Sequence, residues 1–135
     1  MVAYHLHRKG DTMKVSELFN ITIALMNESK DNSTPYKEFT IGMVNNLLMD
    51  LFDMENAIRK HNQKELLESV PFVTSEDDEI QYDTELCYNV LPWGMGRQYF
   101  LGDDEYSKAT FWDSQYAVNK DKYNKANYVD VVSYY

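Results

Sequence analysis

Residues 86–102 read Leu-Cys-Tyr-Asn-Val-Leu-Pro-Trp-Gly-Met-Gly-Arg-Gln-Tyr-Phe-Leu-Gly. Their apolar side chains recur at helical spacing, and Asp83-Thr84-Glu85 just before them is typical of a helix start. Pro92 interrupts the pattern, and it should bend this helix because proline removes one backbone hydrogen bond and clashes with the preceding turn. Gly94 and Gly96 leave room for another backbone to approach closely. The pattern therefore predicts a helix with a kink at the proline.

Amphipathic patterns outside this stretch predict three more helices. The first is expected over about residues 14–29. The second begins at Pro35, with Thr34 as its N-cap, and continues to about His61, which makes it long and apolar enough to be the central helix of a bundle. Gly102 and the acids at 103–105 are expected to end the kinked third helix. A fourth helix is predicted over about 104–122, with acids at its start.

The other segments lack helical periodicity. Residues 62–83 are expected to form a connection with strand character at 70–73 and an acidic loop at 75–79. The acids of this loop are best explained as charges exposed to solvent. Residues 127–135 are β-branched and aromatic, which predicts an extended tail that also suits a strand. The predicted fold is mostly α: a compact four-helix bundle with a kinked third helix (13–126), an N-terminal extension (1–12) and an extended C-terminal docking tail (127–135).

Composition and charge exclude several classes of protein. The 135 residues include 22 acids against 13 Lys and Arg, which gives a net charge of -9. Of these residues, 44% are hydrophobic, which suffices for a core without disulfide bonds or metal ions. The acidity and the scattered basic residues argue against a sequence-reading nucleic-acid protein, because phosphate contacts need clustered Lys and Arg. The single cysteine excludes an internal disulfide. No apolar run is long enough to span a bilayer, and residues 1–12 lack the apolar region of a signal peptide.

The residue pattern contains no catalytic or metal-binding constellation. The three histidines, His5, His7 and His61, have no further ligand at a recognised spacing. Cys87 lies on an apolar helical face and is expected to be a small buried hydrophobe rather than a nucleophile. The stretch 93–96 lacks the preceding strand and the following Lys-Ser or Lys-Thr of a phosphate loop. We therefore expect no enzymatic activity, no cofactor and no bound metal.

Tyrosine is unusually frequent, with eleven copies, and it is concentrated near the C-terminus. It favours interfaces because its ring buries area while its hydroxyl keeps a hydrogen-bond partner. The tail can cover its own domain or dock on another subunit, and the sequence favours neither. Arg97 equally suits an interface or an ion pair inside its own bundle. The candidate interface residues are Tyr128, Val129, Val131, Val132, Tyr134, Tyr135, Trp93 and Arg97.

Several motifs taken together resemble a known family. They are Met13-Lys-Val-Ser-Glu-Leu18, Asp78-Glu-Ile80, Leu91-Pro-Trp-Gly-Met-Gly96 and Phe100-Leu-Gly-Asp-Asp104, followed by the aromatic spacing of Phe111-Trp112 and Tyr116. In this order, residues 13–135 resemble the small head-tail connector (adaptor) proteins of tailed bacteriophages. Residues 1–12 have no counterpart in that pattern, and Trp93 stands where tyrosine is commoner, so the resemblance assigns neither a role.

The resemblance implies a structural role in the neck of the virion, after assembly in the host bacterial cytoplasm. Such adaptors are helical bundles that form rings, typically twelvefold, beneath the portal protein, and they dock the next neck or tail protein. DNA would pass through the ring without sequence-specific binding, and no membrane would be involved. Twelve copies at -9 would give the lumen on the order of a hundred negative charges, a wall to which DNA would not adhere.

A second hypothesis comes from a different class. Small acidic phage proteins can act as regulators that bind one host protein as a monomer or a dimer. Mass measurement at several concentrations separates this hypothesis from a ring.

Overall fold

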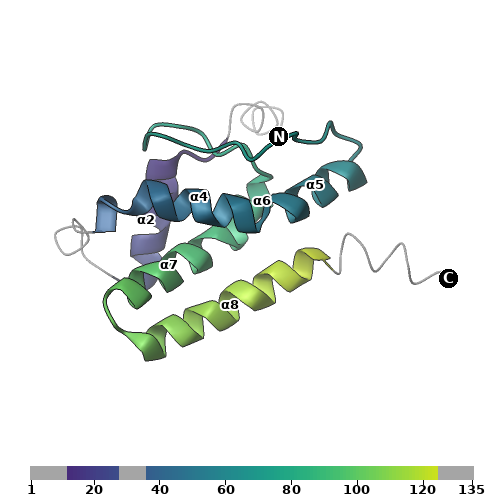
Figure 1. Cartoon of the computed structure of the whole chain (residues 1–135). Coiled ribbons are helices and arrows are strands. Elements are labelled where there is room, and N and C mark those ends of the chain that lie inside the picture. The colour runs from purple at the N-terminus through teal and green to yellow at the C-terminus, as the bar shows by residue number, and fades with distance from the viewer. Residues whose placement is uncertain (1–11, 28–35, 125–135) are drawn as a thin grey trace, which may run out of the picture.

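The computed structural model describes residues 12–27 and 36–124 (Figure 1). Within these ranges the fold is mostly α-helical, as predicted, and it contains no β-strand, so the strand character expected at 70–73 is wrong. The tail at 127–135 and the extension at 1–11 lie outside the described residues. The helices are α2 (Val15–Met26), α4 (Thr40–Asp50), α5 (Phe52–His61), α6 (Thr84–Asn89), α7 (Leu91–Gly102) and α8 (Tyr106–Asn124).

The sequence predicted that the second helix, which ends at about His61, would be the central helix of the bundle. In the structure the central helix is α7 instead. It contacts α2, α4, α6 and α8, and its contact with α8 is the most extensive between any two helices described. Figure 1 shows it between α8 on one side and the layer of α2 and α4 on the other. Its buried side chains include Leu91, Met95, Tyr99 and Phe100. Tyr99 meets Phe19 of α2, and Phe100 meets Trp112 of α8.

Two of the four expected helices are each divided into two. The second expected helix is divided into α4, which ends at Asp50, and α5, which begins at Phe52. Leu51 lies between the two helices and is fully buried. The kinked helix is likewise two helices, with the break at Val90. Pro92 is the second residue of α7, where a missing N–H leaves no hydrogen bond unmade, so the proline begins a helix rather than bending one.

The acidic loop at 75–79 has a structural role that solvation alone does not explain. Its backbone carbonyls accept hydrogen bonds from the first N–H groups of α2: Val15 donates to Asp78 at 3.0 Å, and Ser16 donates to Glu76 at 2.9 Å. These N–H groups have no partner within the helix itself. The loop therefore caps α2 from a position about sixty residues further along the chain, while its acidic side chains are mostly exposed.

The side chain of Asp78 holds this loop in shape. Its carboxylate accepts hydrogen bonds from the backbone N–H groups of Thr74 at 2.7 Å and Ser75 at 3.1 Å. The hydrogen bond from Thr74 lowers the pKa of Asp78 below its usual range.

Two asparagines fasten the connection at 62–83 to the helices beneath it. Asn45 of α4 donates to the carbonyl of Val73 at 2.9 Å and accepts from its N–H at 2.8 Å. Asn56 of α5 makes the same pair with Leu67, at 3.0 and 2.8 Å. Each side-chain amide thus pairs with the backbone as a neighbouring strand would. The backbone N–H and carbonyl of the contacted residue are both hydrogen-bonded, although no sheet is present.

Replacing Asn45 with aspartate should lower the free energy of unfolding by about 1–2 kcal/mol, because the amide donor is lost and a carboxylate faces the carbonyl of Val73. The matched control is Asn46→Asp, which adds the same charge at the next, exposed position and should cost less than about 0.5 kcal/mol. Urea denaturation of both variants measures the difference. Equal losses would show that the amide pair does not stabilise the connection.

Candidate functional site

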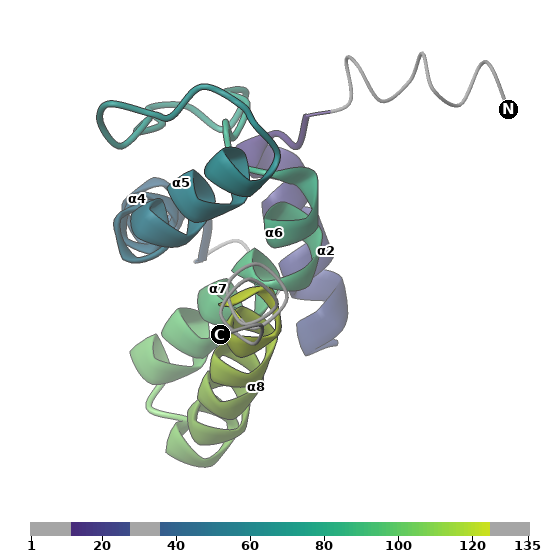
Figure 2. The ribbon, with the colours of Figure 1, turned by 90° about the vertical axis from the view of Figure 1, so that its right-hand side faces the viewer.

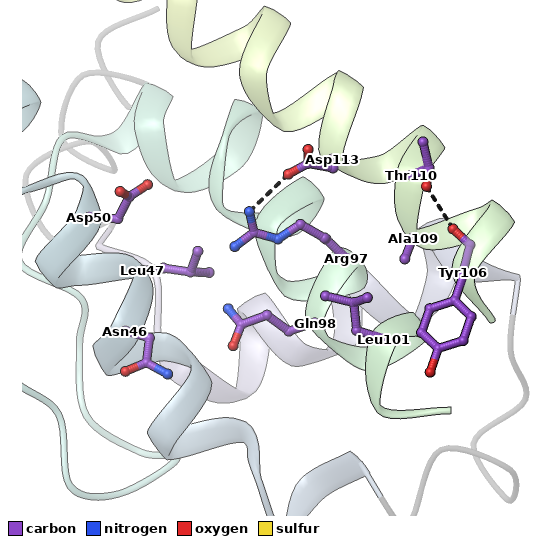
Figure 3. A pocket seen from close by; sticks show the side chains of 10 residues that line it. All are labelled: Asn46, Leu47, Asp50, Arg97, Gln98, Leu101, Tyr106, Ala109, Thr110 and Asp113. Atoms are coloured by element: carbon purple, nitrogen blue, oxygen red, sulfur yellow. Dashed lines mark hydrogen bonds and ion pairs between the residues drawn. The ribbon is translucent and has the colours of Figure 1, made fainter. Parts of the chain in front are cut away.

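A groove of about 510 Å³ lies between α4, α7 and α8 (Figure 3). It contains Arg97, one of the predicted interface residues, together with both amide and apolar side chains. Its polar and apolar groups come from α7 and α8, which follow each other in the sequence, and from α4, which lies well before them. The residues that line it are Asn46, Leu47, Asp50, Arg97, Gln98, Leu101, Tyr106, Ala109, Thr110 and Asp113.

Arg97 makes an ion pair within its own chain, which is one of the two alternatives that the sequence left open. Its Nη1 lies 3.0 Å from Oδ1 of Asp113 on α8, and its guanidinium carbon lies 4.9 Å from the ring centroid of Tyr116. Figure 3 shows the guanidinium pointing from α7 toward α8. The Nε atom is buried and has no hydrogen-bond partner within the part of the chain that the structure describes. A contact of Arg97 with another subunit stays a prediction.

Asp50 ties α4 to α8 at the edge of the groove. Its Oδ2 accepts hydrogen bonds from the hydroxyl of Tyr116 at 2.6 Å and from Nζ of Lys120 at 3.2 Å. Burial acts to raise the pKa of Asp50, but the hydrogen bonds from Tyr116 and Lys120 and the nearby positive charges outweigh it, so the pKa is lowered. For Tyr116, burial and the same carboxylate raise the pKa. The groove is therefore lined with groups that already neutralise one another.

Trp93, the other predicted interface residue that the structure describes, is partly buried and packs against the core, and its contact with another subunit stays a prediction. Its ring centroid lies 4.8 Å from that of Trp112 on α8, and the ring of Phe100 meets Trp112 edge-on at 5.5 Å. A Cβ added at Gly96 would lie 2.2 Å from two carbons of the Trp112 ring. Gly96 thus makes room for the Trp112 ring.

Gly94 also makes room for side chains rather than for a backbone. A Cβ added there would lie 2.6 Å from Cδ2 of Leu47 and 2.9 Å from the Tyr116 ring. The two glycines therefore let α4 and α8 pack closely on α7.

The six predicted interface residues of the tail lie outside the described residues, and their role stays a prediction. They are Tyr128, Val129, Val131, Val132, Tyr134 and Tyr135. Of the predicted set, the structure places only Trp93 and Arg97, one turn apart on α7 and both beneath α8.

The outward side of α8 exposes two apolar residues that were not among the predicted interface residues. Phe111 is 55% exposed and Val118 is 52% exposed, while Ala109, Trp112 and Tyr116 on the inward side are buried. The signal was present in the sequence, because Phe111 and Val118 are seven residues apart and fall off the stripe that packs on the core.

The connection at 62–83 exposes a second pair of apolar residues. Leu66 is 49% exposed and Phe72 is 56% exposed. Each directly precedes a residue, Leu67 or Val73, that an asparagine amide holds to the helices. These exposed side chains are therefore carried by an anchored backbone.

A buried polar cluster holds the two ends of this connection. Glu55 of α5 is only 2% exposed; its Oε2 accepts from Nε of Arg59 at 2.7 Å, and its Oε1 accepts from the N–H of Asp83 at 2.7 Å. Arg59 also donates to the carbonyls of Glu65 at 3.1 Å and Gln81 at 2.8 Å. Burial raises the pKa of Glu55, against the opposing effect of these partners.

Among the residues that the structure describes, Cys87 and His61 lie in different environments. Cys87 is buried, as predicted, and burial raises the pKa of its thiol to about 12. His61 is exposed at the end of α5. Among the described residues there is no group of three or more His, Cys, Asp or Glu side chains arranged to hold a metal ion. No helix in the described ranges is long and apolar enough to cross a membrane.

Comparison with known proteins gives no relative: no family model matches the chain, and no curated protein or solved structure matches it significantly. The function must therefore be inferred from the chain's own residues and surfaces.

Proposed function

We propose that this chain is a structural protein that assembles into a ring of identical copies and serves as a head-tail connector in the neck of a phage particle. The observation that carries the proposal is the pair of exposed apolar surfaces on opposite sides of the molecule. One is the outward side of α8, and the other is the connection at 62–83. In Figures 1 and 2 the connection lies along the top of the molecule and α8 along the bottom.

Two different surfaces are what a ring requires. A head-to-tail contact joins unlike patches on neighbouring copies, and it produces a closed ring when the rotation between copies closes. Half-exposed phenylalanine, leucine and valine side chains on both surfaces offer apolar area to such a contact.

The interior of the molecule supports a mechanical role. Ring closure needs a fixed angle between the two surfaces, and the structure links them through tightly packed elements: α8 lies on α7 through Gly96 and Trp112, and Asn45 and Asn56 fasten the connection. The net charge of -9 per copy also favours a channel wall that does not bind passing DNA. By the resemblance, the partners are the portal on one side and the next neck or tail protein on the other.

Light scattering coupled to size-exclusion chromatography of the full chain, over about a hundredfold range of concentration, tests the proposal. We expect a single multiple of the 15.9 kDa chain mass to dominate at high concentration, and negative-stain images of that fraction to show rings with a central opening. A monomer at every concentration would contradict the ring. A monomer that captures a host protein would favour the regulatory alternative.

A further inference from the structure

The division between α4 and α5 has no local cause in the sequence. Residues 43–61 contain no glycine or proline, and their apolar side chains continue one helical stripe across the junction. Without such residues, a sharp break in a helix arises where a side chain inserts into the ladder of backbone hydrogen bonds. A contact from elsewhere in the fold therefore divides this helix.

Tyr82 makes that contact. It is buried, and its hydroxyl donates to the backbone carbonyl of Leu48 in α4. In a continuous helix this carbonyl would accept from the N–H of Phe52, four residues further on. Phe52 is instead the first residue of α5, and its N–H has no hydrogen-bond partner within the part of the chain that the structure describes. The carbonyl has thus exchanged a backbone partner for the tyrosine hydroxyl.

The backbone ladder is intact immediately before and after this exchange. The N–H of Leu51 donates to the carbonyl of Leu47 at 2.9 Å, and the N–H of Glu55 donates to the carbonyl of Leu51 at 2.8 Å. Leu51 itself has φ -99° and ψ 5°, away from the helical values of about -63° and -42°. The break is therefore confined to a single residue.

The two neighbours of Tyr82 hold the other helix. The carbonyl of Gln81 accepts from Nη2 of Arg59 at 2.8 Å, and the N–H of Asp83 donates to Oε1 of Glu55 at 2.7 Å. Three consecutive residues thus contact α4 through the middle residue and α5 through the outer two. We call residues 81–83 the brace.

We propose that the brace holds residues 40–61 as two helices, and that lifting it joins α4 and α5 into one continuous helix. The exchange conserves hydrogen bonds, because the carbonyl of Leu48 loses the hydroxyl of Tyr82 and gains the N–H of Phe52. The 62–83 connection leaves the end of α5 and finishes in the brace, so a partner that draws this connection away from the helices switches the junction. The device does not depend on ring assembly.

Hydrogen exchange of single backbone amides, followed by NMR on the full chain, tests the proposal. In the wild type, the amide of Phe52 should exchange at least about a hundredfold faster than those of Leu51 and Glu55, which are hydrogen-bonded. Tyr82→Phe removes the hydroxyl and keeps the ring. In this variant the exchange of the Phe52 amide should slow by at least about tenfold, because its N–H gains the carbonyl of Leu48.

The matched control is Tyr99→Phe. It also removes the hydroxyl of a buried tyrosine, but that hydroxyl lies 2.6 Å from the hydroxyl of Thr40 and bonds a side chain rather than the helix backbone. The amide of Phe52 should exchange as fast in this variant as in the wild type. Slowing in the control as well would show that the effect does not come from the junction.

A second variant, Arg59→Lys, releases the brace at its other end. It keeps the charge beside Glu55 but loses the fork that reaches the carbonyl of Gln81, so it should slow the exchange of Phe52 in the same direction. This variant decides the matter if Tyr82→Phe does not fold. Fast exchange of Phe52 in the folded variants, or equal protection of Phe52, Leu51 and Glu55 in the wild type, would overturn the proposal.

Discussion

Replacing Glu55 with alanine is expected to lower the free energy of unfolding by about 3 kcal/mol. The carboxylate is 2% exposed and accepts one hydrogen bond from the Arg59 guanidinium and one from the backbone N–H of Asp83. Its removal leaves a partly buried positive charge and a backbone donor without their acceptor, and each of these is costly in a low-dielectric interior. Because Arg59 also holds both ends of the 62–83 connection, the loss should loosen that surface as well.

Urea denaturation followed by circular dichroism measures the loss. The control is Glu105→Ala, which also removes an acid from an ion pair, with Lys108 at 3.1 Å, but both of these side chains are at least 40% exposed. An exposed pair contributes little, so this control should lose less than about 1 kcal/mol. Similar losses in the two variants would show that burial of Glu55 does not determine its contribution.

Replacing Gly96 with alanine should cost about 2–3 kcal/mol, because overpacking a filled core forces side chains and backbone to shift. The new methyl group would lie 2.2 Å from ring carbons of Trp112. That ring is 7% exposed and is held between Trp93 and Phe100, so it cannot move aside without disturbing both. Alanine is a better helix former than glycine by about 1 kcal/mol, but this gain is smaller than the cost of the clash.

The control for this variant is Gly42→Ala in α4. A Cβ at Gly42 would meet nothing within 4 Å, so only the gain in helix propensity remains, and stability should rise by up to about 1 kcal/mol. Chemical denaturation of the two variants should therefore give changes of opposite sign. An increase in stability for Gly96→Ala would mean that Trp112 does not lie on Gly96.

The helical class of the fold could be predicted from the sequence because it depends on local periodicity. The same periodicity identified Cys87 as buried. It could not show where a helix is divided, since Leu51 fits the apolar stripe although the helix ends on either side of it. It also could not show that the connection caps α2, because that contact joins residues about sixty positions apart.

The candidate site was predicted only in part, for a similar reason. Arg97 was left between two roles because its ion-pair partner Asp113 lies on the next helix, and a sequence pattern does not fix which side chains face each other across a helix pair. Phe111 and Val118 were visible as apolar residues off the buried stripe, but their exposure required the packing of α8 on α7. The role of Asn45 and Asn56 depended on a connection whose path has no local signal.

Electron cryomicroscopy of the full-length protein at assembling concentration tests the central claim most directly. We expect a closed ring of identical copies around an open channel. A population of single copies, or of two-fold dimers, would contradict this account.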